Sequence, residues 1–146
     1  MNRFKLNLSV VSLIIFALVF IVSFPAAGKD MTGKELVEEA KVTIKSISIT
    51  DAKAMLGKSG AVFLDVREPE EFKAGHIPGA INIPRGLLEF QIEQQAPDKN
   101  QTIVVYCRSG NRSALAAATL MKMGYKSILN MDGGWKAWQD AGYPAE

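Results

Sequence analysis

Residues 102–124 read TIVVYCRSGNRSALAAATLMKMG and contain Cys107, the single cysteine of the chain. Residues 102–106 are short, β-branched and bounded by polar residues, which is typical of a buried strand. Residues 113–123 are rich in helix formers, and Gly124 is a residue that commonly ends a helix. The sequence therefore predicts a strand, a small polar loop and a helix that meet at Cys107.

The polar loop after Cys107 has the composition of an anion-binding site. Its backbone N–H groups can point inward, and the positive end of the following helix dipole stabilises an anion there. Most free cysteines are small buried hydrophobic residues, but a packing cysteine needs no arginines beside it. We therefore interpret Cys107 as a catalytic nucleophile at the rim of the site. The predicted substrate-binding residues are Arg108, Ser109, Gly110, Asn111, Arg112 and Ser113.

Short apolar runs alternate with helical patterns along the rest of the chain, which predicts an α/β fold. Strands are expected at residues 47–49, 61–66, 80–83, 102–106 and 126–129. Helices are expected at residues 29–45, from Thr50 or Asp51 to Leu56, and at 68–74, 87–95, 113–123 and 134–141. Thr32 and Glu35 have the spacing of a capping box, which would start the first helix near Gly33. Such alternation is typical of a parallel sheet with helices on both faces.

Three further segments, taken with the cysteine loop, resemble a known family. They are LDVREPEEF at residues 64–72, GHIPGAINIP at 75–84 and MDGGWKAW at 131–138. Their order and content resemble the single-domain rhodanese sulfurtransferases over nearly everything after about Ile47. The resemblance implies a rhodanese-like, parallel, five-stranded sheet for a domain of residues 47–146.

The resemblance also implies a reaction. The Cys107 thiolate would attack the outer sulfur of thiosulfate or a related anionic donor, sulfite would leave, and cyanide or a thiol would accept the sulfur from the Cys107 persulfide. No cofactor is expected for this chemistry. One rival interpretation is a non-catalytic sulfur carrier or binding module, because a carrier needs the same persulfide cradle.

A second rival is a phosphatase or arsenate reductase on the same fold. Those enzymes resemble this chain in placing a cysteine and an arginine around an oxyanion, but they have five residues between the two. Cys107 and Arg112 have four residues between them. The shorter loop favours sulfur transfer, because a persulfide needs room for one sulfur and a phosphate for three oxygens.

Other side chains have structural and functional interpretations. Asp65 and Arg67 close or follow a predicted strand and could form an acid–base pair that supports the site. A structural ion pair, for example from Arg67 to Glu70 or Glu71, is the simpler expectation. We expect His76 to fix the turn at residues 75–79 rather than act as a base. Trp135 and Trp138 are expected to close the core, with a lesser role at the mouth of a pocket.

The N-terminus predicts export. Arg3 and Lys5 precede residues 8–24, which contain only apolar residues and three serines. Residues 1–28 are therefore expected to be a signal peptide cleaved near Gly28, or an anchor formed by residues 8–24. The protein would then be periplasmic, as in a bacterial cell, or otherwise extracytoplasmic, and would meet the membrane only through that anchor. Residues 29–46 are expected to form an amphipathic N-terminal helix that packs on the domain.

Charge and composition exclude other classes of protein. The chain has 17 Lys and Arg and 15 Asp and Glu, but Arg3 and Lys5 belong to the predicted leader, so the domain is formally neutral. This balance gives no support for nucleic-acid binding. One cysteine and one histidine cannot form a structural zinc site, so no metal is expected.

Overall fold

The computed structural model describes residues 30–58 and 60–146. Its centre is a sheet of five strands in the order β1-β5-β4-β2-β3, and every neighbouring pair is parallel. The strands are β1 Lys45–Ile47, β2 Ala61–Asp65, β3 Ile81–Asn82, β4 Thr102–Tyr106 and β5 Ser127–Met131. The predicted five-stranded parallel sheet is confirmed.

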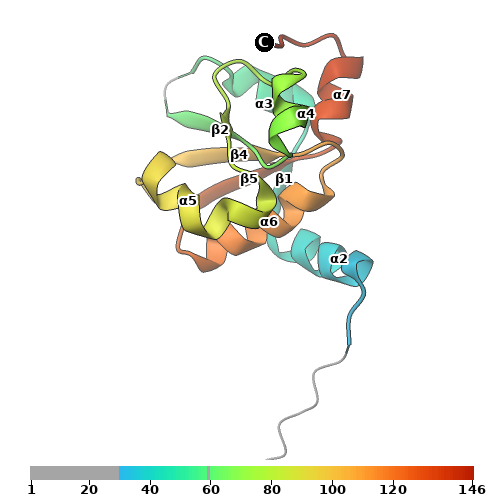
Figure 1. Ribbon diagram of the computed structural model, residues 1–146, viewed down its shortest axis with the longest axis vertical. Helices are drawn as coiled ribbons and strands as arrows, with labels where there is room; N and C mark the ends of the chain where they lie inside the picture. The colour runs from blue at the N-terminus through green and yellow to red at the C-terminus, as the bar shows by residue number, and fades with distance from the viewer. Residues whose placement is uncertain (1–29, 59) are drawn as a thin grey trace, which may run out of the picture. The chain divides into compact units, whose positions relative to one another are not determined.

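Helices cover both faces of this sheet, with α3 and α7 on one face and α5 and α6 on the other (Figure 1). Helix α2 packs against α6. The helices are α2 Gly33–Thr43, α3 Ile49–Met55, α4 Pro69–Lys73, α5 Leu88–Gln95, α6 Asn111–Lys122 and α7 Gly134–Asp140, with a 3₁₀ turn, η1, at Arg85–Leu87.

Strand β4 shows why both faces are buried. Ile103 and Val105 pack into the cluster beneath α5 and α6, whereas Val104 and Tyr106 pack into the cluster beneath α3 and α7. Successive side chains of a strand point to opposite faces, so an unbroken apolar run fits a strand that is covered twice. The central position of β4 places its carboxyl end, and Cys107 directly after it, in the middle of the sheet edge.

Several element boundaries differ from those predicted. The first strand is Lys45–Ile47, because Ser48 caps α3: its hydroxyl accepts a hydrogen bond from the Asp51 N–H at 3.1 Å. Thr50 and Asp51 are therefore inside the helix and are not its cap. The capping box of Thr32 and Glu35 is present, and α2 starts at Gly33 as expected.

The predicted leader, residues 1–28, and the predicted anchor, residues 8–24, lie outside the described residues. Within residues 30–58 and 60–146, no helix combines the length and apolar character needed to cross a membrane.

Candidate active site

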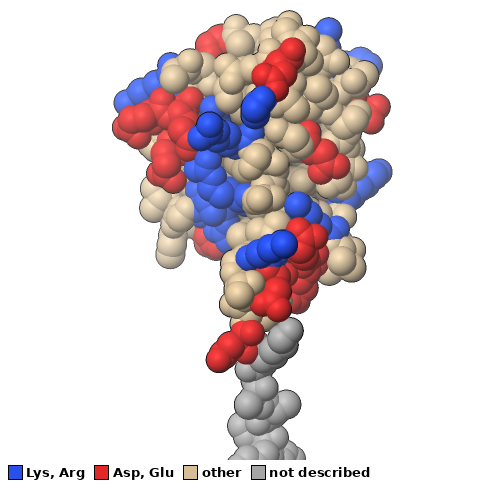
Figure 2. All heavy atoms as spheres, turned by 90° about the vertical axis from the view of Figure 1, so that its right-hand side faces the viewer, with Lys and Arg blue, Asp and Glu red and all other residues tan. Residues whose placement is uncertain are grey.

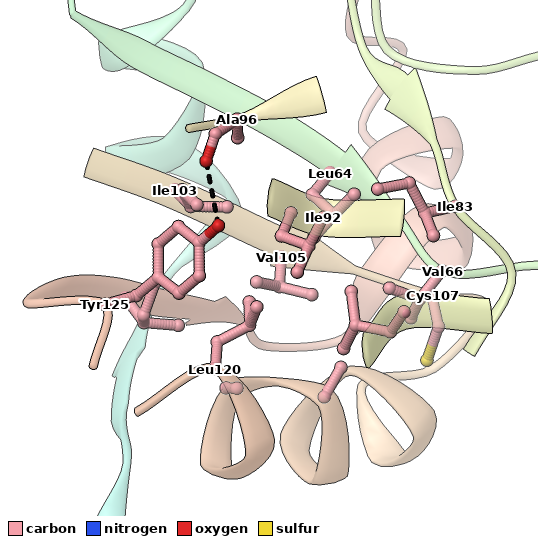
Figure 3. Close-up of a cluster of buried hydrophobic side chains, with 14 residues drawn as sticks. Leu64, Val66, Ile83, Ile92, Ala96, Ile103, Val105, Cys107, Leu120 and Tyr125 are labelled. Carbon is pink, nitrogen blue, oxygen red and sulfur yellow. Dashed lines mark hydrogen bonds between the residues drawn. The ribbon is translucent and has the colours of Figure 1, made fainter. Parts of the chain in front are cut away.

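Cys107 lies directly after β4 and is 1% exposed. It sits at one end of a buried hydrophobic cluster, and Tyr125 lies at the other end (Figure 3). The N–H of Gly110 donates a hydrogen bond to Cys107 Sγ at 3.2 Å. The expectation of a cysteine at the rim was wrong, since the residue packs under the loop. Of the several loop amides expected to point inward, that of Gly110 is hydrogen-bonded to the sulfur.

Gly110 gives the loop its tight curvature. Its φ of 98° lies in the left-handed region that favours glycine, and α6 begins at the next residue, Asn111. The helix therefore starts two residues earlier than predicted, and its first turn is closer to the sulfur. The first N–H groups of a helix have no intrahelical partner and form its positive end. The sulfur thus lies beside a helix terminus whose polarity favours an anion.

Helix α7 holds the cysteine loop from the other side. The N–H of Trp135 donates to the Cys107 carbonyl at 2.8 Å, and the N–H of Lys136 donates to the Arg108 carbonyl at 3.0 Å. Gly134 permits this contact, because a Cβ there would lie 2.4 Å from the Cys107 carbonyl oxygen. With both carbonyls bound to α7, the loop can direct N–H groups toward the sulfur. Sequence reasoning missed this role of Gly134, although the pair of glycines at 133–134 was a signal for it.

Arg112 forms a two-point ion pair with Glu71 of α4. Arg112 Nη1 donates to Oε2 at 2.9 Å and Nη2 donates to Oε1 at 3.0 Å. The Arg112 hydrogen bond holds the pKa of Glu71 below its usual range. The pKa of Arg112 is raised, first by Glu71 and to a smaller degree by the charge of Cys107. The guanidinium thus forms hydrogen bonds to a carboxylate and also interacts electrostatically with Cys107.

Asp65 and Arg67 form a second ion pair, which is buried. Arg67 Nη2 donates to Asp65 Oδ2 at 2.6 Å, and Arg67 Nε reaches the same oxygen at 2.9 Å. The predicted pairing of Arg67 with Glu70 or Glu71 was therefore wrong. Asp65 is the last residue of β2, two residues before Arg67, and forms the pair with it. Glu71 is bound to Arg112 instead. The Arg67 guanidinium also lies 4.9 Å from the centre of the Trp135 ring, which braces α7 against this pair.

The remaining loop residues divide by exposure. Arg108, Ser109 and Asn111 are exposed, and their side chains are accessible to a ligand. Ser113 is fully buried, and its hydroxyl donates to Asn130 Oδ1 of β5 at 2.7 Å. The Ser113 side chain therefore binds the sheet, and only its backbone can take part in a ligand cradle.

His76 fixes the turn of residues 75–79. Its Nδ1 donates to the Phe72 carbonyl at 3.0 Å, and its ring stacks on Phe72 with centroids 3.6 Å apart. These contacts support the interpretation of His76 as a turn residue. Trp138 is fully buried, as expected for a residue that closes the core, and Trp135 is 6% exposed.

An open pocket of about 410 Å³ lies beside the cysteine loop. Its walls include Arg67, Glu71, Arg108, Trp135 and Lys136. Trp135 therefore also borders a pocket, the lesser role expected for it. In the described part of the chain, no group of three His, Cys, Asp or Glu side chains could hold a metal ion.

Comparisons with known proteins agree on one family. Residues 48–141 match the Rhodanese-like domain. The chain is 34% identical over 101 residues to a thiosulfate sulfurtransferase of Pseudoalteromonas translucida, covering 68% of this chain and 93% of that protein. It is 36% identical over 109 residues to the "Putative sulfur carrier protein YrkF" of Bacillus subtilis, covering 73% of this chain and 57% of that protein.

A solved structure from Rhodopseudomonas palustris superimposes with a TM-score of 0.73 at 39% identity, covering 80% of this chain and 95% of that one. That protein is described as being of unknown function and a possible tyrosine phosphatase.

Proposed function

The chain belongs to the rhodanese-like domain family, and from this premise we propose that it transfers sulfane sulfur through a persulfide on Cys107. The Cys107 thiolate attacks the outer sulfur of thiosulfate or a related donor. A bond forms between Sγ and that sulfur, the sulfur–sulfur bond of the donor breaks, and sulfite leaves with the electron pair. Cyanide or a thiol then attacks the outer sulfur of the persulfide and restores the thiolate. Such a two-step route gives ping-pong kinetics.

The observation that carries this proposal is the hydrogen bond from the Gly110 N–H to Cys107 Sγ at 3.2 Å. An amide directed at a sulfur, next to the positive end of α6, stabilises negative charge on that sulfur. Both the attacking thiolate and the persulfide carry such a charge. Donors directed at developing charge are the groups that most often lower a reaction barrier.

The burial of Cys107 favours sulfur transfer over phosphoryl transfer. The residue is 1% exposed, so little of its surface is open to a bulky reacting group. The outer sulfur of thiosulfate is a single atom at the end of its molecule, whereas the phosphorus of a phosphate ester is surrounded by oxygens. The three-residue turn between Cys107 and α6 leaves little room for those oxygens.

A sulfur carrier is the second candidate, and the similarity to the Bacillus subtilis protein supports it. A carrier would form the same persulfide on Cys107 and deliver the sulfur only to a partner protein. The two candidates differ in turnover, because an enzyme consumes thiosulfate continuously when cyanide is supplied.

The intact mass of the protein tests the chemistry. After incubation with thiosulfate, we expect the mass of one added sulfur atom, and cyanide should remove it. Cys107→Ser should fold normally and gain no sulfur, because a hydroxyl cannot form a persulfide. Sulfur uptake by Cys107→Ser would refute the mechanism. Steady formation of thiocyanate by the unchanged protein would distinguish an enzyme from a carrier.

We also propose that the protein is exported, either soluble after cleavage near Gly28 or anchored by residues 8–24. The basic residues Arg3 and Lys5 ahead of an apolar run support this. Cell fractionation of the full chain would find it beyond the cytoplasmic membrane. An intact, soluble cytoplasmic protein would contradict the proposal.

A further inference from the structure

Four basic side chains lie at or next to the pocket that borders the cysteine loop at Arg108. They are Arg67, Arg108, Lys136 and, behind Glu71, Arg112. Three of them are paired with carboxylates, namely Asp65, Asp140 and Glu71. Acidic side chains also flank a band of basic ones on the face seen in Figure 2.

Arg108 differs from the other three. Within residues 30–58 and 60–146, its side chain makes no hydrogen bond or ion pair, and it is exposed. The sequence places two arginines in the cysteine loop, and among the described residues Arg112 is paired with Glu71 whereas Arg108 has no ion-pair partner. An anionic donor that enters the pocket therefore meets one unpaired positive charge, with Glu71 in the same wall.

In the Glu71–Arg112 pair, the Arg112 guanidinium already has a carboxylate partner. Both terminal nitrogens of the guanidinium donate to the Glu71 carboxylate, at 2.9 and 3.0 Å. Such a two-point pair is directional and specific. The side chains of Arg112 and Glu71 are only 37% and 33% exposed, so water screens their charges less than on an open surface.

We propose that Glu71 is a specificity-determining positioning residue, which binds Arg112, cancels one cation of the cysteine loop and so disfavours doubly charged sulfur donors relative to singly charged ones. This inference rests on the proposed sulfur transfer. Glu71 does not touch the reacting sulfur and acts through Arg112. The net charge of the Glu71–Arg112 pair then sets the preference among donors.

Two donors of the same chemistry separate charge from reactivity. Thiosulfate carries two negative charges, and methanethiosulfonate carries one. In both, Cys107 attacks the outer sulfur, a new sulfur–sulfur bond forms, and the old one breaks with its electron pair on sulfite or on methanesulfinate. The ratio of kcat/KM for thiosulfate to kcat/KM for methanethiosulfonate measures the preference for charge.

Glu71→Gln gives the pair a net positive charge and keeps an oxygen that can accept from Arg112. We expect the thiosulfate-to-methanethiosulfonate ratio to rise about three- to fivefold, as one unit charge acts on one extra donor charge in a partly screened site. Arg112→Ala leaves Glu71 unpaired, so the ratio should fall by a similar factor. In the double variant Glu71→Gln/Arg112→Ala, the two positions carry no net charge, so the ratio should be close to that of the unchanged protein.

Glu70→Gln is the matched control, because it is the same substitution at the neighbouring, exposed residue of α4. It should change the ratio much less than Glu71→Gln does. At high salt, the ratios of all variants should converge.

Equal changes of kcat/KM with both donors in Glu71→Gln would overturn the inference, because they would mean that Glu71 only supports the loop. A double variant that keeps the low ratio of Arg112→Ala would also overturn it. Failure of both donors to add sulfur to Cys107 in the unchanged protein would instead refute the proposed function. The intact mass separates these two failures.

Discussion

Two arginine–carboxylate pairs stand near the cysteine loop, and they differ in burial. The side chains of Asp65 and Arg67 are 0% and 3% exposed, whereas those of Glu71 and Arg112 are 33% and 37% exposed. Removing one partner of a buried pair leaves a charge without water or counterion, which is strongly destabilising. A partly exposed pair contributes little to stability. The buried pair therefore stabilises the fold, and the partly exposed pair is the one that we propose acts on donor preference.

Their positions in the chain agree with this division. Asp65 and Arg67 are two residues apart at the end of β2, and Arg67 also donates to the Gly75 carbonyl at 2.8 Å. The pair thereby joins β2 to the turn after α4. Glu71 and Arg112 instead connect α4 to the first turn of α6, the helix that follows the Cys107 loop.

Asp65→Asn should have the largest effect on stability. The substitution keeps the size of the side chain but leaves the Arg67 charge buried, so we expect a loss of about 3–5 kcal/mol in the free energy of unfolding. Urea titration at pH 7 measures it. Glu71→Gln removes the same charge and should cost no more than about 1 kcal/mol. If both variants lost the same free energy of unfolding, the two ion pairs would not differ in their contribution to stability.

Gly134→Ala should have the next largest effect, because it disturbs the backbone of the loop at Cys107 and Arg108. Its φ is +59°, and its new Cβ would meet the Cys107 carbonyl, so we expect a loss of about 2–3 kcal/mol. Gly142→Ala is the control: φ is +65°, but no atom lies within 4 Å of its Cβ, and about 1 kcal/mol of strain is expected.

Activity sharpens the test of Gly134. Sulfur uptake by Cys107 should fall in Gly134→Ala and stay unchanged in Gly142→Ala, both measured by intact mass below the melting temperature. If the two variants lose the same stability and keep the same activity, α7 does not position the loop.

The smallest effect is the dependence of stability on pH through Glu71. Its pKa is lower in the folded protein than its usual value of 4.5, mainly because Arg112 donates to it. Its stabilising contribution is therefore complete above pH 4.5 and is lost as the pH falls through the lower, folded pKa. The unchanged protein should exceed Glu71→Gln in stability by up to about 1 kcal/mol at pH 7. The difference should disappear in strong acid, and a constant difference would show that the carboxylate charge is irrelevant.

Local signals in the sequence determined much of the fold. Residues 102–106 form the predicted strand because their β-branched side chains fit a sheet covered on both faces. The capping box of Thr32 and Glu35 started α2 at the predicted residue, since all of its contacts lie within one helical turn. The order of the four family segments was enough to identify the family, whose domain matches residues 48–141.

Tertiary structure alone decided that Arg112 of the cysteine loop forms an ion pair with Glu71. The sequence placed Arg108 and Arg112 in one loop, but Arg112 meets Glu71 only because β2 and β4 are neighbours, which brings α4 beside the start of α6. The position of the Cys107 loop likewise depends on α7, whose N–H groups bind the carbonyls of Cys107 and Arg108, with Gly134 leaving room for the contact. Hydrogen bonds within a turn depend on nearby residues and can be predicted from the sequence. Contacts between helices depend on the order of the strands in the sheet. That order cannot be deduced from the spacing of residues along the chain.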